Sequence, residues 1–183
     1  MNNFTSLITR RRSTRKFKEN PLSPEQVASI LKAALMAPTS KGANAWQFVV
    51  VEDKNTLRKL AACKKHGAAF LEECTLAVVV LGDTSISDAW VEDASIASIY
   101  MQLQAEDLGV GSCWCQVRNR LTEDRHASEQ YVRELLGIPD HFGVLSIIGF
   151  GHKDQERKPF DEANLLWEKV HIGSFSTQEI PLQ

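Results

Sequence analysis

The sequence has no apolar run long enough to cross a membrane. The longest run, Leu76 to Leu81, has the length of a β-strand, whereas a transmembrane helix needs about 20 apolar residues. The N-terminal residues also lack the apolar core of a signal peptide, because polar residues interrupt Phe4, Leu7 and Ile8. These absences argue against a membrane-spanning helix and predict a cytoplasmic protein. The lack of acidic residues before Glu19 would also fit a cleaved transit peptide, which is the alternative.

The chain also lacks an excess of either charge. Its 183 residues include 21 basic and 23 acidic side chains, for a net charge of −2. Such a balance gives no global attraction to nucleic acid or to an anionic membrane, so we expect neither as a partner. Linkers, repeats and low-complexity tracts are missing too, which predicts a single domain over residues 1–183.

Cysteine is scarce and is not arranged for metal binding. The four cysteines, Cys63, Cys74, Cys113 and Cys115, form no spaced CxxC pairs, and the five histidines are scattered. We therefore expect no metal site and reduced thiols. Cys113 and Cys115 lie two residues apart in a predicted strand, where we expect them on opposite faces and unable to pair.

The hydrophobic pattern predicts alternating helices and strands. The clearest helix begins at Pro24, where Ser23 and Gln26 have the spacing of a capping box, and it ends before Pro38. Further helices are expected at Asn2–Thr9, Lys54–Ala62, Asp88–Leu108 and Glu129–Leu136, and strands at Trp46–Val51, Leu76–Leu81, Ser112–Val117 and Val144–Phe150. This order predicts an α+β fold, a three-layer α/β/α sandwich with a mixed central sheet flanked by helices.

The C-terminal tail, Phe160 to Gln183, is rich in apolar residues without a regular pattern. Such a segment must bury those residues against its own domain or against a partner chain.

The arginine segment, residues 11–15, reads Arg-Arg-Ser-Thr-Arg. Guanidinium groups and hydroxyls so close together suit a phosphate or a polarised carbonyl. A solvated basic patch is the plainer alternative. A nucleic-acid contact through Arg10 to Lys18 is another, although no stacking aromatics lie nearby.

A second candidate is the loop from Pro38 to Asn44, which precedes the strand beginning at Trp46. Its small and hydroxyl residues would allow the backbone to approach a flat ligand, and Asn44 can donate and accept hydrogen bonds. On the residues alone, the pattern favours an ordinary helix-to-strand turn.

Taken together and in order, these motifs resemble the FMN-dependent nitroreductase family. The order is Arg-Arg-Ser-x-Arg, then Ala-Pro-Thr-Ser before Trp-x-Phe, then Leu-Gly-Val-Gly-Ser-Cys-Trp at 108–114, then Ile-Ile-Gly-Phe at 147–150. The resemblance covers nearly the whole chain. Departures are Thr39 and Gly42, where many relatives carry serine and asparagine, and Asn44-Ala45, where they carry Gln-Pro.

The resemblance implies a homodimer whose two FMN sites lie at the interface, with the tail packed on the partner chain. One chain would supply the arginine segment and the other the Pro38–Ser40 loop. The cofactor-binding residues implied are Arg11, Arg12, Ser13, Arg15, Pro38, Thr39, Ser40, Asn44, Trp114, Cys115, Gln116, Arg157 and Lys158. Lys153 is a weaker phosphate candidate, and Lys65 or His66 would lie near the flavin.

The activity implied is electron transfer from NADH or NADPH to nitroaromatic or quinone-like acceptors, in a ping-pong sequence. The flavin would carry the electrons, so no catalytic side chain is expected. Arg15 would stabilise negative charge at the N1–O2 edge of the ring. Dehalogenation or dehydrogenation on the same scaffold, and a non-enzymatic anion-binding module, remain the alternatives.

Overall fold

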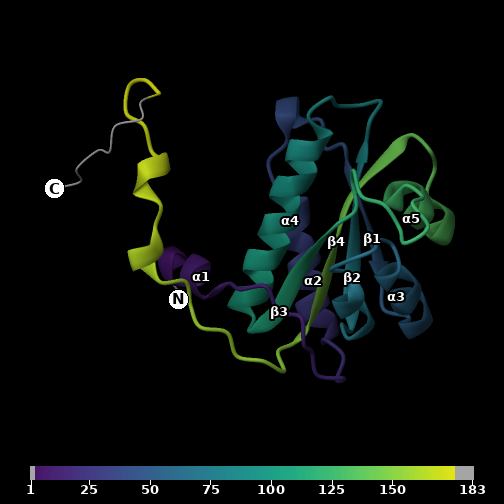
Figure 1. The fold of residues 1–183 in the computed structure, drawn as a ribbon, viewed down its shortest axis with the longest axis horizontal. Coiled ribbons are helices and arrows are strands. Elements are labelled where there is room, and N and C mark those ends of the chain that lie inside the picture. The colour runs from purple at the N-terminus through teal and green to yellow at the C-terminus, as the bar shows by residue number, and fades with distance from the viewer. Residues whose placement is uncertain (1–2, 176–183) are drawn as a thin grey trace.

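The computed structural model describes residues 3–175, and the elements follow the predicted order (Figure 1). Asn2 of the predicted first helix and residues 176–183 of the predicted tail lie outside the described residues. The elements are α1 (Phe4–Arg10), α2 (Pro24–Leu35), η1 (Ser40–Gly42), β1 (Trp46–Val51), α3 (Lys54–Ala61), η2 (Ala69–Glu72), β2 (Leu76–Asp83), α4 (Trp90–Asp107), β3 (Val110–Gln116), α5 (Ser128–Leu136), β4 (Phe142–His152), η3 (Glu162–Asn164) and η4 (Trp167–Lys169).

The four strands form one sheet in the order β1-β2-β4-β3. All three neighbouring pairs are antiparallel, so the predicted mixed sheet is wrong in this detail. The apolar pattern predicts where a strand lies but not its direction, because the direction depends on how the connecting segments return the chain to the sheet. The one parallel pairing within residues 3–175 is an isolated bridge between Ser13 and Ser112.

Helices cover both faces of the sheet, which confirms the three layers. Figure 1 shows α2 and α4 on one face and α3 and α5 on the other. Ile30 and Met101 pack in the core under α2 and α4, whereas Leu57 and Val132 belong to the core under α3 and α5. Strand β2 is buried along its full length, as its uninterrupted apolar sequence predicts.

Local capping explains where the helices begin. The Ser23 hydroxyl accepts the Gln26 N–H at 3.3 Å, and the Gln26 side chain accepts the Ser23 N–H at 2.9 Å, which confirms the capping box. Asp53 caps α3 by accepting the Thr56 N–H at 2.8 Å. Helix α5 ends at Gly137, whose φ of 67° lies in the left-handed region that glycine adopts without strain.

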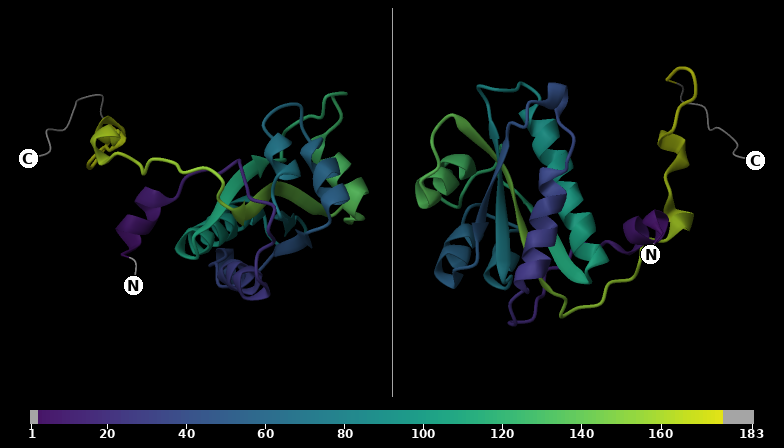
Figure 2. Two further views of the ribbon diagram at one scale, coloured as in Figure 1. Left: turned by 90° about the horizontal axis from the view of Figure 1, so that it is seen from below. Right: turned by 180° about the vertical axis from the view of Figure 1, so that it is seen from behind.

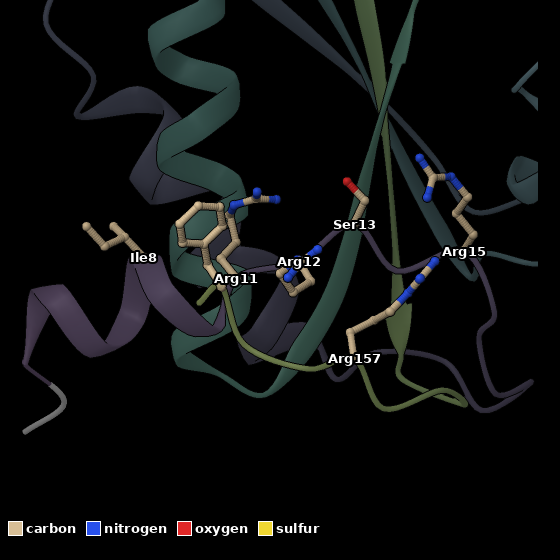
Figure 3. A pocket seen from close by; sticks show the side chains of 7 residues that line it. Ile8, Arg11, Arg12, Ser13, Arg15 and Arg157 are labelled. Atoms are coloured by element: carbon tan, nitrogen blue, oxygen red, sulfur yellow. The ribbon is translucent and has the colours of Figure 1, made fainter. Parts of the chain in front are cut away.

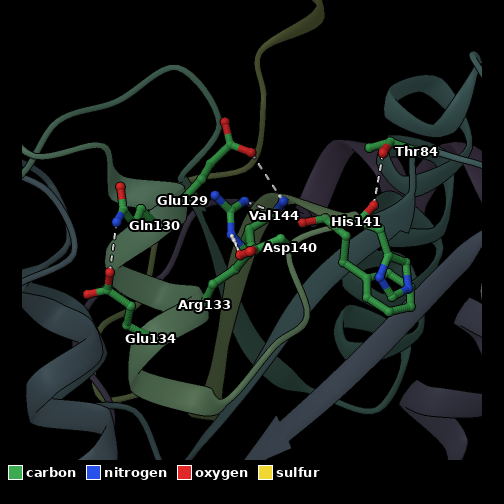
Figure 4. A network of polar contacts seen from close by, with 9 residues as sticks. Thr84, Glu129, Gln130, Arg133, Glu134, Asp140, His141 and Val144 are labelled. Carbon is green, nitrogen blue, oxygen red and sulfur yellow. Dashed lines mark hydrogen bonds and ion pairs between the residues drawn. The ribbon is translucent and has the colours of Figure 1, made fainter.

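Polar contacts fix α5 to the neighbouring strand β4 (Figure 4). The backbone N–H of Val144 donates to the Glu129 carboxylate at 3.3 Å. Arg133 lies 3.8 Å from the carboxylate of Asp140 in the connection to β4.

The cysteines correct one expectation. Side chains two residues apart in a strand share a face, and Cys113 and Cys115 both lie in the core under α3 and α5. All four cysteines are buried and free. A hydrogen bond with Cys115, and then burial, raise the pKa of the Cys63 thiol.

Helix α1 and the start of the C-terminal tail lie side by side and project from the sheet (Figures 1 and 2). The Phe160 N–H donates to the Thr9 carbonyl at 2.8 Å, which joins the start of the tail to α1. Beyond it, Leu166, Trp167 and Phe175 are exposed, so the described part of the tail buries little of its apolar surface. Within residues 3–175, no helix combines the length and hydropathy that crossing a membrane requires.

Candidate functional site

A cavity of about 400 Å³ opens beside the arginine segment (Figure 3). Its polar lining comes from two parts of the chain that are far apart in sequence. Ile8 and Phe160 provide the apolar part, and the remaining lining residues are Arg11, Arg12, Ser13, Arg15 and Arg157. The structure therefore brings together five of the predicted cofactor-binding residues.

The sheet holds the arginine segment in an extended conformation. The Thr14 N–H donates to the Ser112 carbonyl at 2.9 Å, which attaches the segment to the free edge of β3. The Lys18 N–H donates to the His152 carbonyl at 2.9 Å, which attaches the following residues to the end of β4. Because Thr14 is only 2% exposed and faces inward, its neighbours Ser13 and Arg15 face the cavity.

A second contact brings in the basic loop after β4. One guanidinium nitrogen of Arg12 donates to the Lys158 carbonyl at 2.9 Å. Arg157 lines the cavity, whereas Lys158 is exposed and contributes a backbone carbonyl.

The cavity is strongly cationic. Four guanidiniums line it, and no carboxylate does. Within the described residues, none of the four is in an ion pair with a carboxylate. Lys153 differs, because its ammonium contacts the Glu106 carboxylate at 2.8 Å in a smaller adjoining cavity.

Burial raises the pKa of the Cys113 thiol, while Arg15 and, more weakly, Lys64 lower it. Lys65, one of the two residues that the sequence suggested near the flavin, forms an ion pair with Glu123 at 3.1 Å, and His66, the other, is exposed. The placement of either residue near a flavin stays a prediction.

The loop from Pro38 to Asn44 has an unusual backbone conformation. Lys41, Gly42 and Asn44 have φ values of 53°, 67° and 49°, in the left-handed region. Side-chain hydrogen bonds hold it: the Thr39 hydroxyl contacts the Asn44 amide oxygen at 3.2 Å and also accepts the Asn44 N–H at 3.2 Å. Asn44 therefore stabilises the loop, because its side-chain oxygen is hydrogen-bonded to the Thr39 hydroxyl.

The loop lies far from the arginine segment of the same chain. The Ser40 N–H donates to Asp93 near the start of α4, whereas Glu106, at the other end of α4, lines the small cavity with Arg12. At 1.5 Å per residue, these two positions on α4 are about 20 Å apart. Figure 1 shows α1 beside the end of α4 that leads into β3.

Trp114, Cys115 and Gln116 occupy the end of β3. The Trp114 indole N–H donates to the Gln116 amide oxygen at 2.9 Å, and the Gln116 amide donates to the Arg118 carbonyl at 3.1 Å. The Cys115 side chain is completely buried on the face of the sheet that α3 and α5 cover, so only its backbone could contact a ligand outside the core. No group of three His, Cys, Asp or Glu side chains within residues 3–175 could hold a metal ion.

The structure is that of an α+β protein with a cationic cavity at the edge of an antiparallel sheet. The sequence model of the nitroreductase family matches residues 8–79 and 63–152. The chain belongs to the nitroreductase family.

Solved structures and curated relatives agree with this. An FMN-dependent nitroreductase from Clostridium difficile R20291 is 44% identical, with a TM-score of 0.92, over 94% of this chain and 100% of that one. A protein of Archaeoglobus fulgidus, whose proposed assignment is NADH dehydrogenase/NAD(P)H nitroreductase, is 36% identical over 90% of this chain and 92% of its own. The NADPH-flavin oxidoreductase of Vibrio harveyi is 32% identical, with coverage of 100% and 78%.

Proposed function

We propose that the protein is an oxidoreductase that binds FMN and transfers electrons from NADH or NADPH to small oxidised acceptors. The observation that carries the proposal is the cavity lined by Arg11, Arg12, Arg15 and Arg157 without a carboxylate. Relatives named for FMN or NADPH chemistry, among them an FMN reductase (NADPH) of Bacillus subtilis and the Vibrio harveyi enzyme, support the same activity.

The residues present fit FMN. A phosphate dianion suits converging guanidiniums, which supply paired donors in a fixed geometry, and the Ser13 hydroxyl adds another donor. Arg11, Arg12 and Arg157 would hold the phosphate, while Arg15 would lie at the N1–O2 edge of the ring. FMN would supply two-electron redox chemistry between the nicotinamide and the acceptor. Arg15 would stabilise the negative charge that reduction places at the ring edge.

The proposed site is shared between two chains. Pro38, Thr39 and Ser40 lie near the start of α4, whereas the arginine segment lies near its end, about 20 Å away along the helix. In a symmetric homodimer, each loop would meet the arginine segment of the other chain. An apolar groove of about 410 Å³, lined by Phe4, Ala33, Met36 and Tyr100 among others, and the exposed apolar tail would then be covered at the interface.

The acceptors we propose are nitroaromatic or quinone-like compounds. Because both substrates would use the same face of the flavin in turn, the kinetics would be ping-pong. A steady-state screen of acceptors with NADH and with NADPH tests this, and parallel lines in double-reciprocal plots are the expected result. Intersecting lines, or turnover only with halogenated or saturated substrates, would favour dehalogenation or dehydrogenation on the same scaffold. A colourless protein that binds anions in a salt-sensitive manner would instead favour a binding module.

A further inference from the structure

The loop from Thr39 to Asn44 needs a contact with the rest of the protein to keep its backbone conformation. Lys41 and Asn44 are non-glycine residues in the left-handed region, where the backbone of an ordinary residue such as lysine is strained. The Thr39–Asn44 hydrogen bonds close the loop on itself but do not attach it to the rest of the protein. The attachment comes from Asp93, whose Oδ1 accepts the Ser40 N–H at 2.8 Å.

Asp93 is an unusual residue for this position. It lies in the first turn of α4 and is only 3% exposed, whereas its neighbour Glu92 is exposed. Its second oxygen, Oδ2, is buried and has no hydrogen-bond partner within residues 3–175. Burying a carboxylate with one oxygen unsatisfied is costly, and within the described residues its other oxygen accepts the Ser40 N–H. The contact with the loop is therefore what this buried side chain provides.

We propose that Asp93 is a positioning residue for the cofactor: it fixes the Ser40 backbone and thereby orders the Thr39–Asn44 loop that would face the flavin. The inference rests on the proposed function, in which this loop belongs to the FMN site. Asp93 acts through Ser40 and does not itself touch the ligand. Without it, the loop relaxes toward ordinary backbone conformations, and FMN binding must then supply the ordering free energy.

Four variants separate this role from a general loss of stability. Asp93→Ala removes the acceptor, and Asp93→Asn keeps an oxygen that can accept the Ser40 N–H. Glu92→Ala is the matched control on the same turn. Ser40→Pro removes the donor at the other end of the bond, and the extended backbone of Thr39 (φ −133°, ψ 154°) tolerates a following proline.

The loop is measured first, without flavin, in the full-length apoprotein. Hydrogen exchange of the peptide containing Ser40 and tryptic cleavage after the exposed Lys41 both report its order. We expect faster exchange and several-fold faster cleavage in Asp93→Ala and Ser40→Pro, and wild-type behaviour in Glu92→Ala and largely in Asp93→Asn. Unchanged exchange and cleavage in Asp93→Ala would overturn the anchor, whatever its effect on stability.

Cofactor affinity is measured second, by quenching of FMN fluorescence on titration with apoprotein. We expect the Kd for FMN to rise at least about tenfold in Asp93→Ala, in the range of one lost charged hydrogen bond, with recovery in Asp93→Asn. A loosened loop with an unchanged Kd would overturn the positioning role. Failure of the wild-type protein to bind FMN would overturn the proposed function instead, while the flavin-free loop measurements would still decide whether Asp93 is the anchor.

Discussion

The Lys153 ammonium bonds to both carboxylate oxygens of Glu106, at 2.9 and 2.8 Å. The Glu106 side chain is 8% exposed and that of Lys153 22%, so the pair is largely withdrawn from solvent. This contact joins the end of β4 to the end of α4, directly beside the arginine segment. Lys153, a weaker phosphate candidate from sequence, is thus neutralised by a carboxylate, and the nearby guanidiniums keep their charge available for a ligand.

Breaking this ion pair should destabilise the protein strongly. Lys153→Met leaves the Glu106 carboxylate buried without its partner, which costs roughly 3 kcal/mol of unfolding free energy. Urea denaturation of the apoprotein measures the loss. The double variant Glu106→Leu/Lys153→Met should recover most of it, and Lys158→Met, at an exposed lysine, is the control. A loss below about 1 kcal/mol in Lys153→Met would contradict the buried pair.

The purified protein should hold FMN non-covalently, about one per chain. The reason is that Arg11, Arg12, Arg15 and Arg157 line one cavity without a carboxylate among its lining residues, which suits a phosphate dianion and the ring edge. Acid precipitation followed by chromatography identifies the released flavin. If FAD is released in place of FMN, or if no flavin is found even after reconstitution, the prediction is contradicted.

Arg15→Gln should slow flavin reduction more than it weakens FMN binding. Removing a fixed cation from the N1–O2 edge withdraws its stabilisation of the reduced ring, an effect on the order of ten- to a thousandfold in rate. Stopped-flow reduction by the preferred nicotinamide measures it. Lys16→Gln is the control, because Lys16 is an exposed neighbouring cation that does not line the cavity. An unchanged reduction rate at full FMN occupancy would show that Arg15 is only a surface residue.

The sequence predicted most elements because their signals are local. The Ser23–Gln26 spacing marks the start of α2, and the apolar run of β2 marks a strand covered on both faces. Long-range relationships could not be predicted in this way. Lys153 meets Glu106 across 47 residues, and Asp93 meets Ser40 across 53, without any periodicity that relates them. The ion pair between Lys65 and Glu123 likewise joins two loops, which have no pattern that fixes their register.

Gly143→Ala should destabilise the fold by overpacking. A Cβ at Gly143 would lie 2.5 Å from the Trp90 ring, and one at Gly82 equally close, so the indole occupies the space that both glycines leave open. The expected cost is about 1–3 kcal/mol, because the ring is held between two strands and α4. Thermal unfolding measures it. Combining Gly143→Ala with Trp90→Leu should reduce the additional cost of the alanine, whereas simple additivity of the two changes would argue against the clash.

The shared active site can be tested by complementation between two inactive variants. Arg15→Glu reverses the charge at the ring edge, and Ser40→Trp blocks the loop about 20 Å away along α4. Each homodimer carries a lesion in both of its sites, so neither variant should be active alone. The two are unfolded together, refolded as a mixture and assayed with the preferred nicotinamide and acceptor.

Symmetry fixes the expected recovery of activity. In a mixed dimer, one site receives both lesions and the other receives neither, because each site combines Arg15 of one chain with Ser40 of the other. Random pairing places half of the chains in mixed dimers, so about a quarter of all sites should regain activity. If both residues served a site within one chain, every site would keep one lesion and mixing would restore nothing. Absence of recovery, with mixed dimers demonstrated by mass spectrometry, would therefore rule out the shared site, and recovery near one quarter requires it.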